Sequence, residues 1–293
     1  MKKKLLFSVL LAAVLCAFSA IYCFAEAPSG DYRLLLSDEF DGSALNTEIW
    51  DWRSGNPYGG KNLKENVRLE DGKLVIDYKK IDGYYTGGGV LTNFNLPYGY
   101  YETRAKVFGG TGRFHTSFWL SGGSAFTTRP ENYPQKNCMI EIDGFEIDSE
   151  NPTSISHGIH YWWARHESTS RWAYRDIDPS KEWFTMGMEW LPDRLNFYIN
   201  GQLVNTDDAV RVYGPSYLWL TAVAMPEGKE DLIDDSKLPG KSEFDYFRYY
   251  QKPLKNVNLL GNGNFEYDRG GNQNDPYCYI LKGDTKAIFP IES

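Results

Sequence analysis

The chain has little cysteine, no surplus of positive charge and a single long apolar run. Its 293 residues include four cysteines. Cys16 and Cys23 lie in the first 25 residues, which are expected to be removed, so Cys138 and Cys278 leave at most one internal disulfide. A disulfide-stapled mini-protein is therefore excluded. Lysine and arginine total 31 against 39 aspartates and glutamates, a net charge of −8, which argues against nucleic acid and acidic lipid as partners.

The apolar run lies at the N-terminus and is typical of a secretory signal. Lys2–Lys4 precede an apolar segment from Leu5 to about Phe18, and cleavage is expected after Ala25. The segment is short for a membrane span, so we expect residues 1–25 to be removed, with a retained anchor as the alternative. Loss of three lysines changes the net charge from −8 to −11. The mature protein is then expected to be secreted, periplasmic or at the cell surface, without a membrane partner.

Short alternating segments separated by turn residues dominate the rest of the chain. Asp71-Gly72 and Asn200-Gly201 each lie between two such segments, which predicts two β-hairpins. No long window repeats with the 3.6-residue period of a helix. Many short strands with glycine-rich turns predict an all-β fold, a large antiparallel sandwich or barrel.

The composition changes near residue 254. Residues 255–293 are rich in asparagine and glycine and have few apolar anchors before Ile288, so they are too short to bury their own core. We expect one catalytic domain over residues 26–254. The segment Val257–Glu266 resembles the first strand of galactose-binding-like carbohydrate modules, so the tail is interpreted as the truncated start of such a module. A packed extra strand or a flexible tail is the alternative.

Three carboxylates lie within residues 141–146. Glu141 and Asp143 share one face of a strand, whereas Glu146 has the opposite parity. A β-bulge at Gly144 would bring Glu146 onto the same face. Because like charges repel, a purely structural strand would not favour this arrangement, whereas a retaining glycosidase needs two carboxylates, one as nucleophile and one as acid/base. An exposed acidic strand or a metal-binding patch is the alternative.

In this context the chain resembles glycoside hydrolase family 16 over roughly residues 31–251. The resemblance implies an endo-acting enzyme on a jelly-roll sandwich of two curved antiparallel sheets with a concave substrate cleft. Besides the acids, it depends on Leu36-Ser-Asp-Glu-Phe-Asp-Gly, Tyr98-Gly-Tyr-Tyr-Glu-Thr-Arg-Ala-Lys, Phe118-Trp-Leu, Phe184-Thr-Met-Gly-Met-Glu-Trp with Phe197-Tyr-Ile-Asn-Gly, and Asp245-Tyr-Phe-Arg-Tyr-Tyr-Gln.

The resemblance implies a role for each of the three acids. Glu141 would be the nucleophile, Glu146 the general acid/base, and Asp143 would hydrogen-bond the nucleophile and hold a proton in the site. Two neighbouring carboxylates are expected to raise the pKa of Glu146, as an acid that acts near neutral pH requires. Cleavage would retain the anomeric configuration, and no cofactor would be needed.

Three softer candidates for substrate binding are Asn66, Trp119 and His160. Asn66 matches a family position that bonds sugar hydroxyls, or it ends a turn. Trp119 would lie on the cleft floor near the nucleophile, or in the core. His160 lies on the strand after the acids and would reach the leaving-group side, or it packs as a structural residue.

The segment after His160 adds aromatic and basic candidates. Alternation lets only one of Trp162 and Trp163 face the cleft, where it would stack on a sugar. Arg165, with Arg171 and Arg175, would meet a sulfate or carboxylate of the substrate. The alternative for these arginines is a set of solvated loop charges.

Departures from the family pattern leave the substrate open. Glucan-active members have Gly-x-Trp-Pro-Ala-Phe-Trp where this chain has Gly112-Arg-Phe-His-Thr-Ser-Phe-Trp, and Thr221 stands where an asparagine is usual. The Ser-Phe-Trp form is more similar to members that act on red-algal galactans. The expected substrate is therefore a red-algal galactan or a β-glucan.

Two further expectations come from the resemblance. Asp245 matches a ligand position of the structural calcium ion that some family members bind far from the acids. The enzyme is expected to act as a monomer on a polysaccharide. A carbohydrate-binding protein without catalysis, and a transglycosylase that uses the same residues, are the competing functions.

Overall fold

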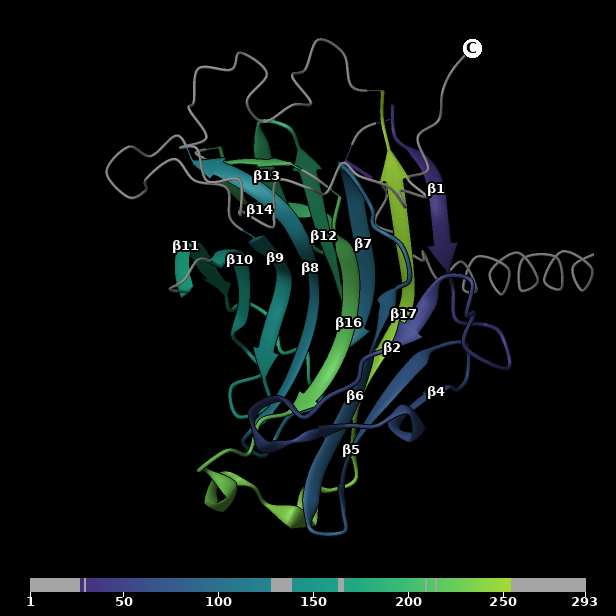
Figure 1. The fold of residues 1–293 in the computed structure, drawn as a ribbon, viewed down its shortest axis with the longest axis vertical. Helices are drawn as coiled ribbons and strands as arrows, with labels where there is room; N and C mark the ends of the chain where they lie inside the picture. Colours follow the sequence, from purple (N-terminus) through teal and green to yellow (C-terminus); the bar gives the residue numbers. More distant parts are fainter. Residues whose placement is uncertain are drawn as a thin grey trace, which may run out of the picture.

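A computed structural model describes residues 27–28, 30–127, 139–162, 166–208, 210–213 and 215–253 of the chain. Within these residues the chain forms seventeen β-strands and four short 3-10 turns and no α-helix (Figure 1). No helix among them is long and apolar enough to cross a membrane. The proposed signal, the tail, Cys138 and Cys278 lie outside the described residues, so the predictions made for them stay predictions.

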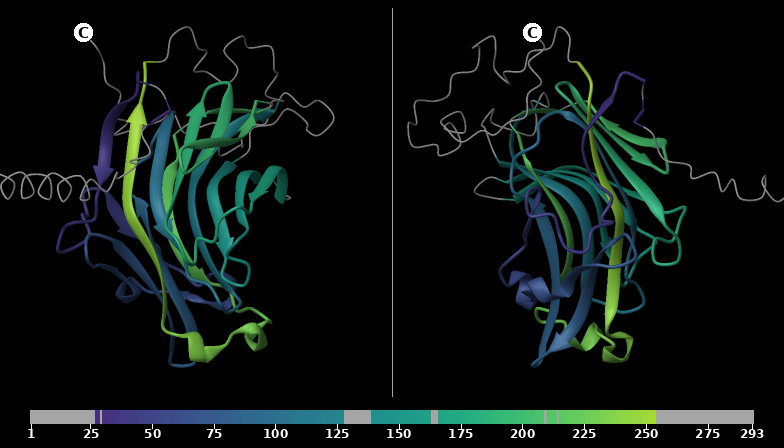
Figure 2. Two further views of the ribbon diagram at one scale, coloured as in Figure 1. Left: turned by 180° about the vertical axis from the view of Figure 1, so that it is seen from behind. Right: turned by 90° about the vertical axis from the view of Figure 1, so that its right-hand side faces the viewer.

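The strands form two antiparallel layers that share a core. The first layer, sheet A, is built around the long strand β17, which runs most of the length of the molecule in Figure 2. Its strands are β1 (Arg33–Asp38), β4 (Val67–Leu69), β5 (Leu74–Ile81), β7 (Gly99–Lys106), β12 (Phe184–Leu191), β13 (Arg194–Ile199), β14 (Gln202–Asp207) and β17 (Gly240–Gln251).

The second layer, sheet B, has the order β2, β6, β16, β8, β9, β10, β11. Strands β8, β9 and β16 are curved in Figure 1. The strands are β2 (Trp50–Trp52), β6 (Tyr84–Thr92), β8 (Phe114–Thr127), β9 (Met139–Asp148), β10 (Ile155–Trp162), β11 (His166–Tyr174), β15 (Val210–Tyr213), which pairs with β8, and β16 (Tyr217–Ala224). The short strand β3 (Lys61–Asn62) pairs in parallel with β6. The 3-10 turns are η1 (Pro57–Gly59), η2 (Lys64–Asn66), η3 (Glu230–Leu232) and η4 (Asp235–Lys237). The predicted all-β jelly-roll sandwich is confirmed.

Both predicted hairpins are present. Asp71 and Gly72 have φ angles of 52° and 68°, and Asn200 and Gly201 have φ angles of 51° and 76°. Positive φ at both central residues is the requirement of a type I′ turn, which asparagine, aspartate and glycine adopt at low cost. The first turn joins β4 to β5 and the second joins β13 to β14.

An aromatic core fills the space between the sheets. Phe145 of β9 contacts Phe184 of β12 and Phe244 of β17, with ring centroids 5.2 and 6.3 Å apart. All three side chains are essentially inaccessible to solvent. Burial of each such ring contributes roughly 1.5–3 kcal/mol, so β9 is firmly fixed to the opposite sheet. This anchoring fixes the strand that carries the three acids.

Candidate active site

Strand β9 contains the predicted bulge. β8 pairs Ser117 with Glu146 and Trp119 with Asp143, so two steps along β8 match three steps along β9. The register on β10 shifts by the same single residue. Gly144 is the extra residue, because the neighbours on either side keep their partners. The bulge therefore restores Glu146 to the face of the other acids.

Packing explains why the extra residue is a glycine. Gly144 and Phe145 both face the core, where Phe145 is fully buried. A Cβ atom at position 144 would lie 2.8 Å from Cδ1 of Phe118 and 2.9 Å from Sδ of Met188. Both distances are shorter than normal carbon contacts, so a larger residue would push β9 away from the core. The local sequence thus determines both the bulge and the direction of Glu146.

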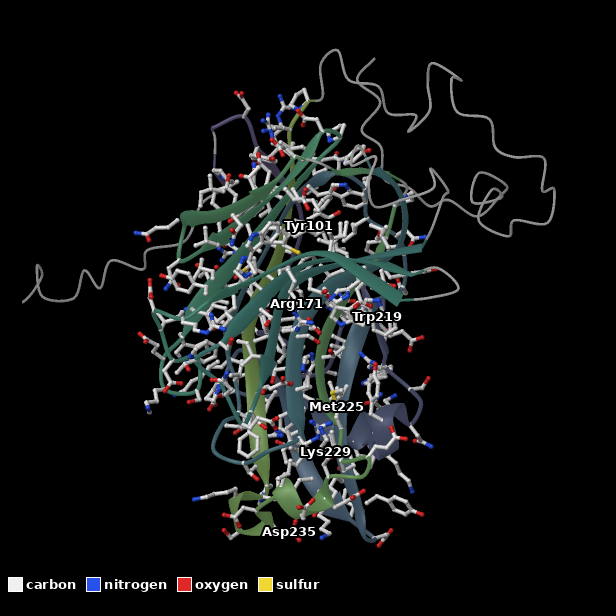
Figure 3. All side chains as sticks on the ribbon, turned by 90° about the vertical axis from the view of Figure 1, so that its left-hand side faces the viewer. Tyr101, Arg171, Trp219, Met225, Lys229 and Asp235 are labelled. Carbon is white, nitrogen blue, oxygen red and sulfur yellow. The ribbon has the colours of Figure 1, made fainter. Side chains whose placement is uncertain are left out.

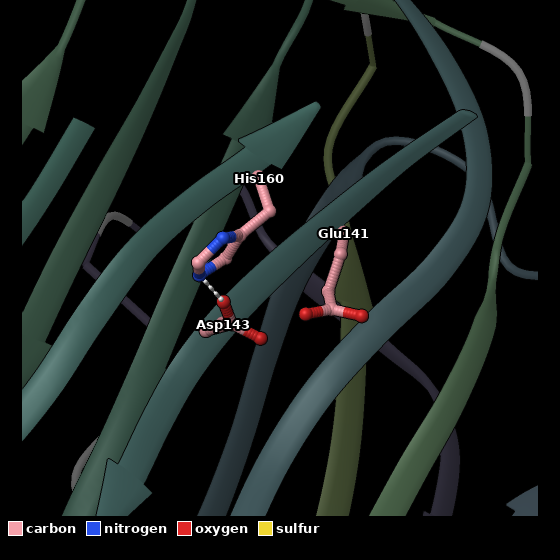
Figure 4. A group of neighbouring side chains, drawn as sticks. All are labelled: Glu141, Asp143 and His160. Atoms are coloured by element: carbon pink, nitrogen blue, oxygen red, sulfur yellow. Dashed lines mark ion pairs between the residues drawn. The ribbon is translucent and has the colours of Figure 1, made fainter. Parts of the chain in front are cut away.

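The three acids converge on one imidazole. The partners of Glu141 and Glu146 on β8 are four residues apart, which is about 13 Å along a strand. Even so, Nε2 of His160 lies 3.1 Å from Asp143 and 3.9 Å from Glu146. One ligand atom each from Glu141, Asp143 and His160 lies within 4.8 Å of the others (Figure 4). The side chains therefore lean together and form one site.

Two cations contact Glu146, one from the neighbouring strand β8 and one from β11, which lies beyond β10. Nε2 of His115 on β8 lies 3.3 Å from one carboxylate oxygen, and a guanidinium nitrogen of Arg171 on β11 lies 2.9 Å from the other. Nδ1 of His115 also contacts Asp148 at 2.8 Å. Burial alone would lower the pKa of His115, but these two acids outweigh it and raise the pKa to about 9. His115 is therefore an imidazolium at neutral pH.

These cations overturn one expectation from the sequence. Neighbouring acids were expected to raise the pKa of Glu146. Burial does favour its neutral form, but the hydrogen bond and charge of His115, and the charges of Arg171 and His160, lower the pKa overall. Burial and the charge of Glu146 instead raise the pKa of Asp143 well above its usual value. The proton shared by this pair is therefore held on Asp143.

One line of paired residues crosses the outer face of sheet B through the acids. Trp219 pairs with Trp119, Trp119 with Asp143, Asp143 with Gly158, and Gly158 with Arg171. Figure 3 shows Trp219 and Arg171 at the same level of the molecule. Residues directly opposite each other in a sheet share a face, so this line runs from aromatic residues, past the acids, to a cation.

The aromatic end of this line is a stacked pair. The Trp119 and Trp219 rings lie 4.9 Å apart at an angle of 13°, and both side chains are partly exposed. The Arg53 guanidinium lies 5.6 and 5.5 Å from the two ring centroids, within cation–π range. Nε1 of Trp119 donates to Oγ1 of Thr221, which also bonds Ser117 Oγ at 2.6 Å. These contacts hold the two indoles in a fixed orientation beside the acids.

Comparison with known proteins agrees with this geometry. The sequence pattern of "Glycosyl hydrolases family 16" matches residues 55–237, more than half of the chain. The chain belongs to glycosyl hydrolase family 16. It is 24% identical to a β-glucanase of Acetivibrio thermocellus over 99% of this chain and 84% of that protein. It is 29% identical to β-porphyranase B of Phocaeicola plebeius over 62% of this chain and 70% of that protein. The solved endo-β-1,3(4)-glucanase SCLam is 25% identical, with a TM-score of 0.62 over 78% of this chain and 94% of that one.

Family membership fixes the class of activity. The protein is an endo-acting glycoside hydrolase, and hydrolases of this family generally need no cofactor for catalysis. The relatives include a glucanase and a porphyranase, so the family alone leaves the polysaccharide open.

The structure brings two of the predicted substrate residues of this family 16 enzyme, Trp119 and His160, to the acids, but not Asn66. Trp119 and His160 lie on the acid-bearing face, as described above. Asn66 is 1% exposed, and its amide donates to Thr86 Oγ1 at 2.9 Å and to the Gly87 carbonyl at 3.0 Å. It ends the turn η2, so the structural alternative describes it better than a sugar contact.

Apart from the arginine on β11, the remaining predicted positions do not contact the acids in the described part of the chain. Trp162 ends β10, where it pairs with Met139, and its side chain is not described. Trp163 and Arg165 lie outside the described residues. Arg175 is exposed after the end of β11. Stacking by Trp162 and anion binding by Arg165 therefore stay predictions.

At both candidate metal sites the carboxylates already contact another side chain. The Asp245 carboxylate is 2.7 Å from the Arg104 guanidinium, so a calcium ion there would compete with an ion pair. Glu141, Asp143 and His160 could together hold a cation, because each offers one ligand atom within 4.8 Å of the others. The contact between Asp143 and Nε2 of His160 at 3.1 Å already uses one of these ligand atoms from each residue.

Two residues of the site, His115 and Trp219, are not among the candidates from the sequence. His115 was noticed only as part of a departure from the family pattern, although it shares strand parity with Trp119 and therefore its face. Trp219 has the same parity relation to Thr221 on β16. Arg171 is one of the arginines predicted to meet a substrate anion or to be solvated loop charges; it lies on β11 and contacts Glu146, so the solvated-loop alternative does not describe it.

Proposed function

We propose that the enzyme is a retaining endo-β-glycosidase that cleaves a polysaccharide, a red-algal galactan or a β-glucan, by double displacement. The observation that carries the proposal is the bulge at Gly144, which aligns Glu141, Asp143 and Glu146 on one face. Two carboxylates that act on the same glycosidic bond are the requirement of this mechanism.

Each acid has a distinct role in the proposed reaction. When substrate binds, the proton held on Asp143 passes to Glu146. Glu141 then attacks the anomeric carbon while Glu146 gives this proton to the leaving sugar oxygen, which forms a glycosyl-enzyme. Glu146 then takes a proton from water, and the water displaces Glu141. Asp143 supports this exchange because it holds a proton beside Glu146 in the free enzyme. His160, in contact with Asp143 and Glu146, orients the pair.

The stacked indoles support a sugar-binding role on one side of the acids. Trp119 and Trp219 offer partly exposed aromatic surface in line with Asp143, and flat rings suit the apolar faces of sugars. Arg53 lies against both rings and adds hydrogen-bond donors at the same place. We assign this platform to the sugars on the non-leaving side, because Arg171 lies across Asp143 from it and contacts the acid/base Glu146.

The setting of the enzyme follows from its substrate. A polysaccharide cannot enter a cell intact, so the proposed signal at residues 1–25 fits action outside the cytoplasm. The net charge of −8 supports the absence of nucleic acid as a partner, and we propose a monomer. Calcium at Asp245 is not included, because Arg104 already neutralises that carboxylate.

Product stereochemistry tests the proposal. Wild-type enzyme is screened for reducing sugars on laminarin, lichenan, agarose, porphyran and carrageenans, and the first product is followed by proton NMR. The β anomer is expected to appear first. For Glu146→Ala with an activated substrate, azide should restore turnover and give a β-glycosyl azide, because azide needs no general base.

Other outcomes would refute specific parts. An α-glycosyl azide would contradict retention. Longer oligosaccharides among the products would identify a transglycosylase. Loss of all activity after dialysis against EDTA, restored by a divalent ion, would favour metal chemistry at Glu141, Asp143 and His160.

A further inference from the structure

Arg171 lies where a substrate group beside the leaving oxygen would meet it. Its pairing partner on β10 is Gly158, which has no side chain to separate the Arg171 position on β11 from Asp143 on β9. The guanidinium crosses this space and contacts Glu146 at 2.9 Å. In the proposed mechanism Glu146 protonates the leaving sugar, so Arg171 is adjacent to that sugar.

The Arg171 side chain is open to a ligand. It is 46% exposed, whereas the Glu146 carboxylate that it contacts is 19% exposed. A guanidinium has five N–H donors in a planar fork that matches the two oxygens of a sulfate or carboxylate. A single ion-pair contact to Glu146 leaves most of that fork available.

The charges around Glu146 favour an additional anion. His115 and Arg171 both contact it, and His160 lies 3.9 Å away. Asp148 takes the second nitrogen of His115, but no described acid other than Glu146 is in an ion pair with Arg171. The charges of His115 and Arg171 keep Glu146 ionised, although Glu146 must be protonated to act as the acid. An anionic group on the substrate would pair with Arg171 in place of Glu146, so the pKa of Glu146 would rise.

We propose that Arg171 binds a sulfate or carboxylate group on the leaving-group sugar, and so selects an acidic polysaccharide over its neutral counterpart. The inference rests on the proposed function for the location of the leaving group. A protein with a net charge of −8 repels polyanions on average, so selection of one needs such a local cation.

Binding to a catalytically inactive variant tests the inference apart from turnover. Affinities of Glu141→Gln are measured by calorimetry for oligosaccharides of a sulfated galactan and of the same galactan after desulfation. A second pair is a β-glucan and its C6-oxidised uronate form, which separates sulfate from carboxylate as the source of charge. At least one charged member should bind about tenfold tighter than its neutral partner, the effect of one charge-assisted hydrogen bond.

The same measurements are made with Arg171→Gln added. The preference should fall to less than about twofold, and Arg171→Lys should keep part of it because the charge remains. Arg194→Gln is the matched control, because Arg194 lies on β13 of the other sheet and its side chain is 48% exposed. It should leave the preference unchanged.

Two results would overturn the inference. One is an unchanged preference in Arg171→Gln, and the other is an equal loss of affinity for the charged and neutral members. If wild-type enzyme cleaves none of the four polymers but the charge preference depends on Arg171, the anion site stands and the proposed hydrolysis falls.

Discussion

Each sheet carries acids on the face turned away from the core, and the two sets of acids differ in their hydrogen-bond and charge partners. In sheet A, Glu189 accepts hydrogen bonds from the Tyr32 hydroxyl, the Asn196 amide and the Lys252 ammonium at 2.6–2.9 Å. Glu102 accepts from two tyrosine hydroxyls at 2.7 and 2.9 Å. These acids have the donors that buried carboxylates require.

In sheet B the partners of Asp143 and Glu146 are imidazole and guanidinium groups instead. Within the described part of the chain, neither Asp143 Oδ2 nor Glu146 Oε2 meets an amide or hydroxyl donor, although both are buried. Asp143 Oδ2 lies 3.1 Å from Nε2 of His160, and Glu146 Oε2 lies 2.9 Å from the Arg171 guanidinium. The difference shows that acids that hold the fold are saturated with hydrogen bonds from hydroxyl, amide and ammonium groups. The acids that meet a substrate are instead held by imidazole and guanidinium groups, which can exchange partners with it.

The largest effect should come from exchanging one acid of each kind for its amide. Glu141→Gln should lower kcat at least about a thousandfold with little change in Tm, because the nucleophile is lost without loss of packing. Glu189→Gln should keep kcat per folded molecule but lower the free energy of unfolding by about 1–3 kcal/mol, because it breaks charge-assisted hydrogen bonds. Initial rates and thermal unfolding measure both.

The comparison fails if the two variants behave alike. More than a tenth of wild-type activity in Glu141→Gln would remove its assignment as nucleophile. A loss of activity in folded Glu189→Gln as large as that in Glu141→Gln would show that sheet A contributes to the chemistry.

A smaller effect is expected where the core positions the acids. Gly144→Ala places a methyl group 2.8 Å from Phe118 and 2.9 Å from Met188, so β9 must shift. Overpacking should cost about 1–3 kcal/mol, and displacement of Glu146 by about 1 Å should lower kcat roughly a hundredfold. Met188→Ala in the same chain makes room for the methyl group, so recovery of kcat in the double variant would attribute the loss to this contact. Full activity in Gly144→Ala alone would show that the bulge tolerates a side chain.

The sequence was sufficient to predict those features of the fold and the site that depend on residues close together along the chain. The parity of Glu141, Asp143 and Glu146, together with the glycine between them, was sufficient to predict the bulge. The dipeptides Asp71-Gly72 and Asn200-Gly201 were sufficient for the hairpins. Each is a short-range consequence of strand alternation or of positive φ.

What the sequence could not predict depends on register between distant strands. Arg171 is 25 residues from Glu146 along the chain, and they meet only because β10 lies between β9 and β11 with Gly158 at the crossing. The pKa of Glu146 was misjudged for this reason: the acids near it in sequence were visible, but the cations from β8 and β11 were not. Register fixes such contacts, and a single bulge changes it.

The smallest effects should separate the two sheets by pH. Burial raises the pKa of Glu102 to about 7, and its acid partners raise that of His115 to about 9 despite burial. Both folded-state values exceed the unfolded ones, so each group stabilises the fold fully at low pH and loses this contribution as pH rises. The loss spans about pH 4.5–7 for Glu102 and about pH 6.5–9 for His115, on the order of 1–3 kcal/mol each. Thermal unfolding against pH should therefore lose its first step in Glu102→Gln and its second in His115→Gln. Retention of the second step in His115→Gln would mean that the cation beside Glu146 is not an imidazolium, and the contrast between saturated and cation-held acids would then rest on Arg171 alone.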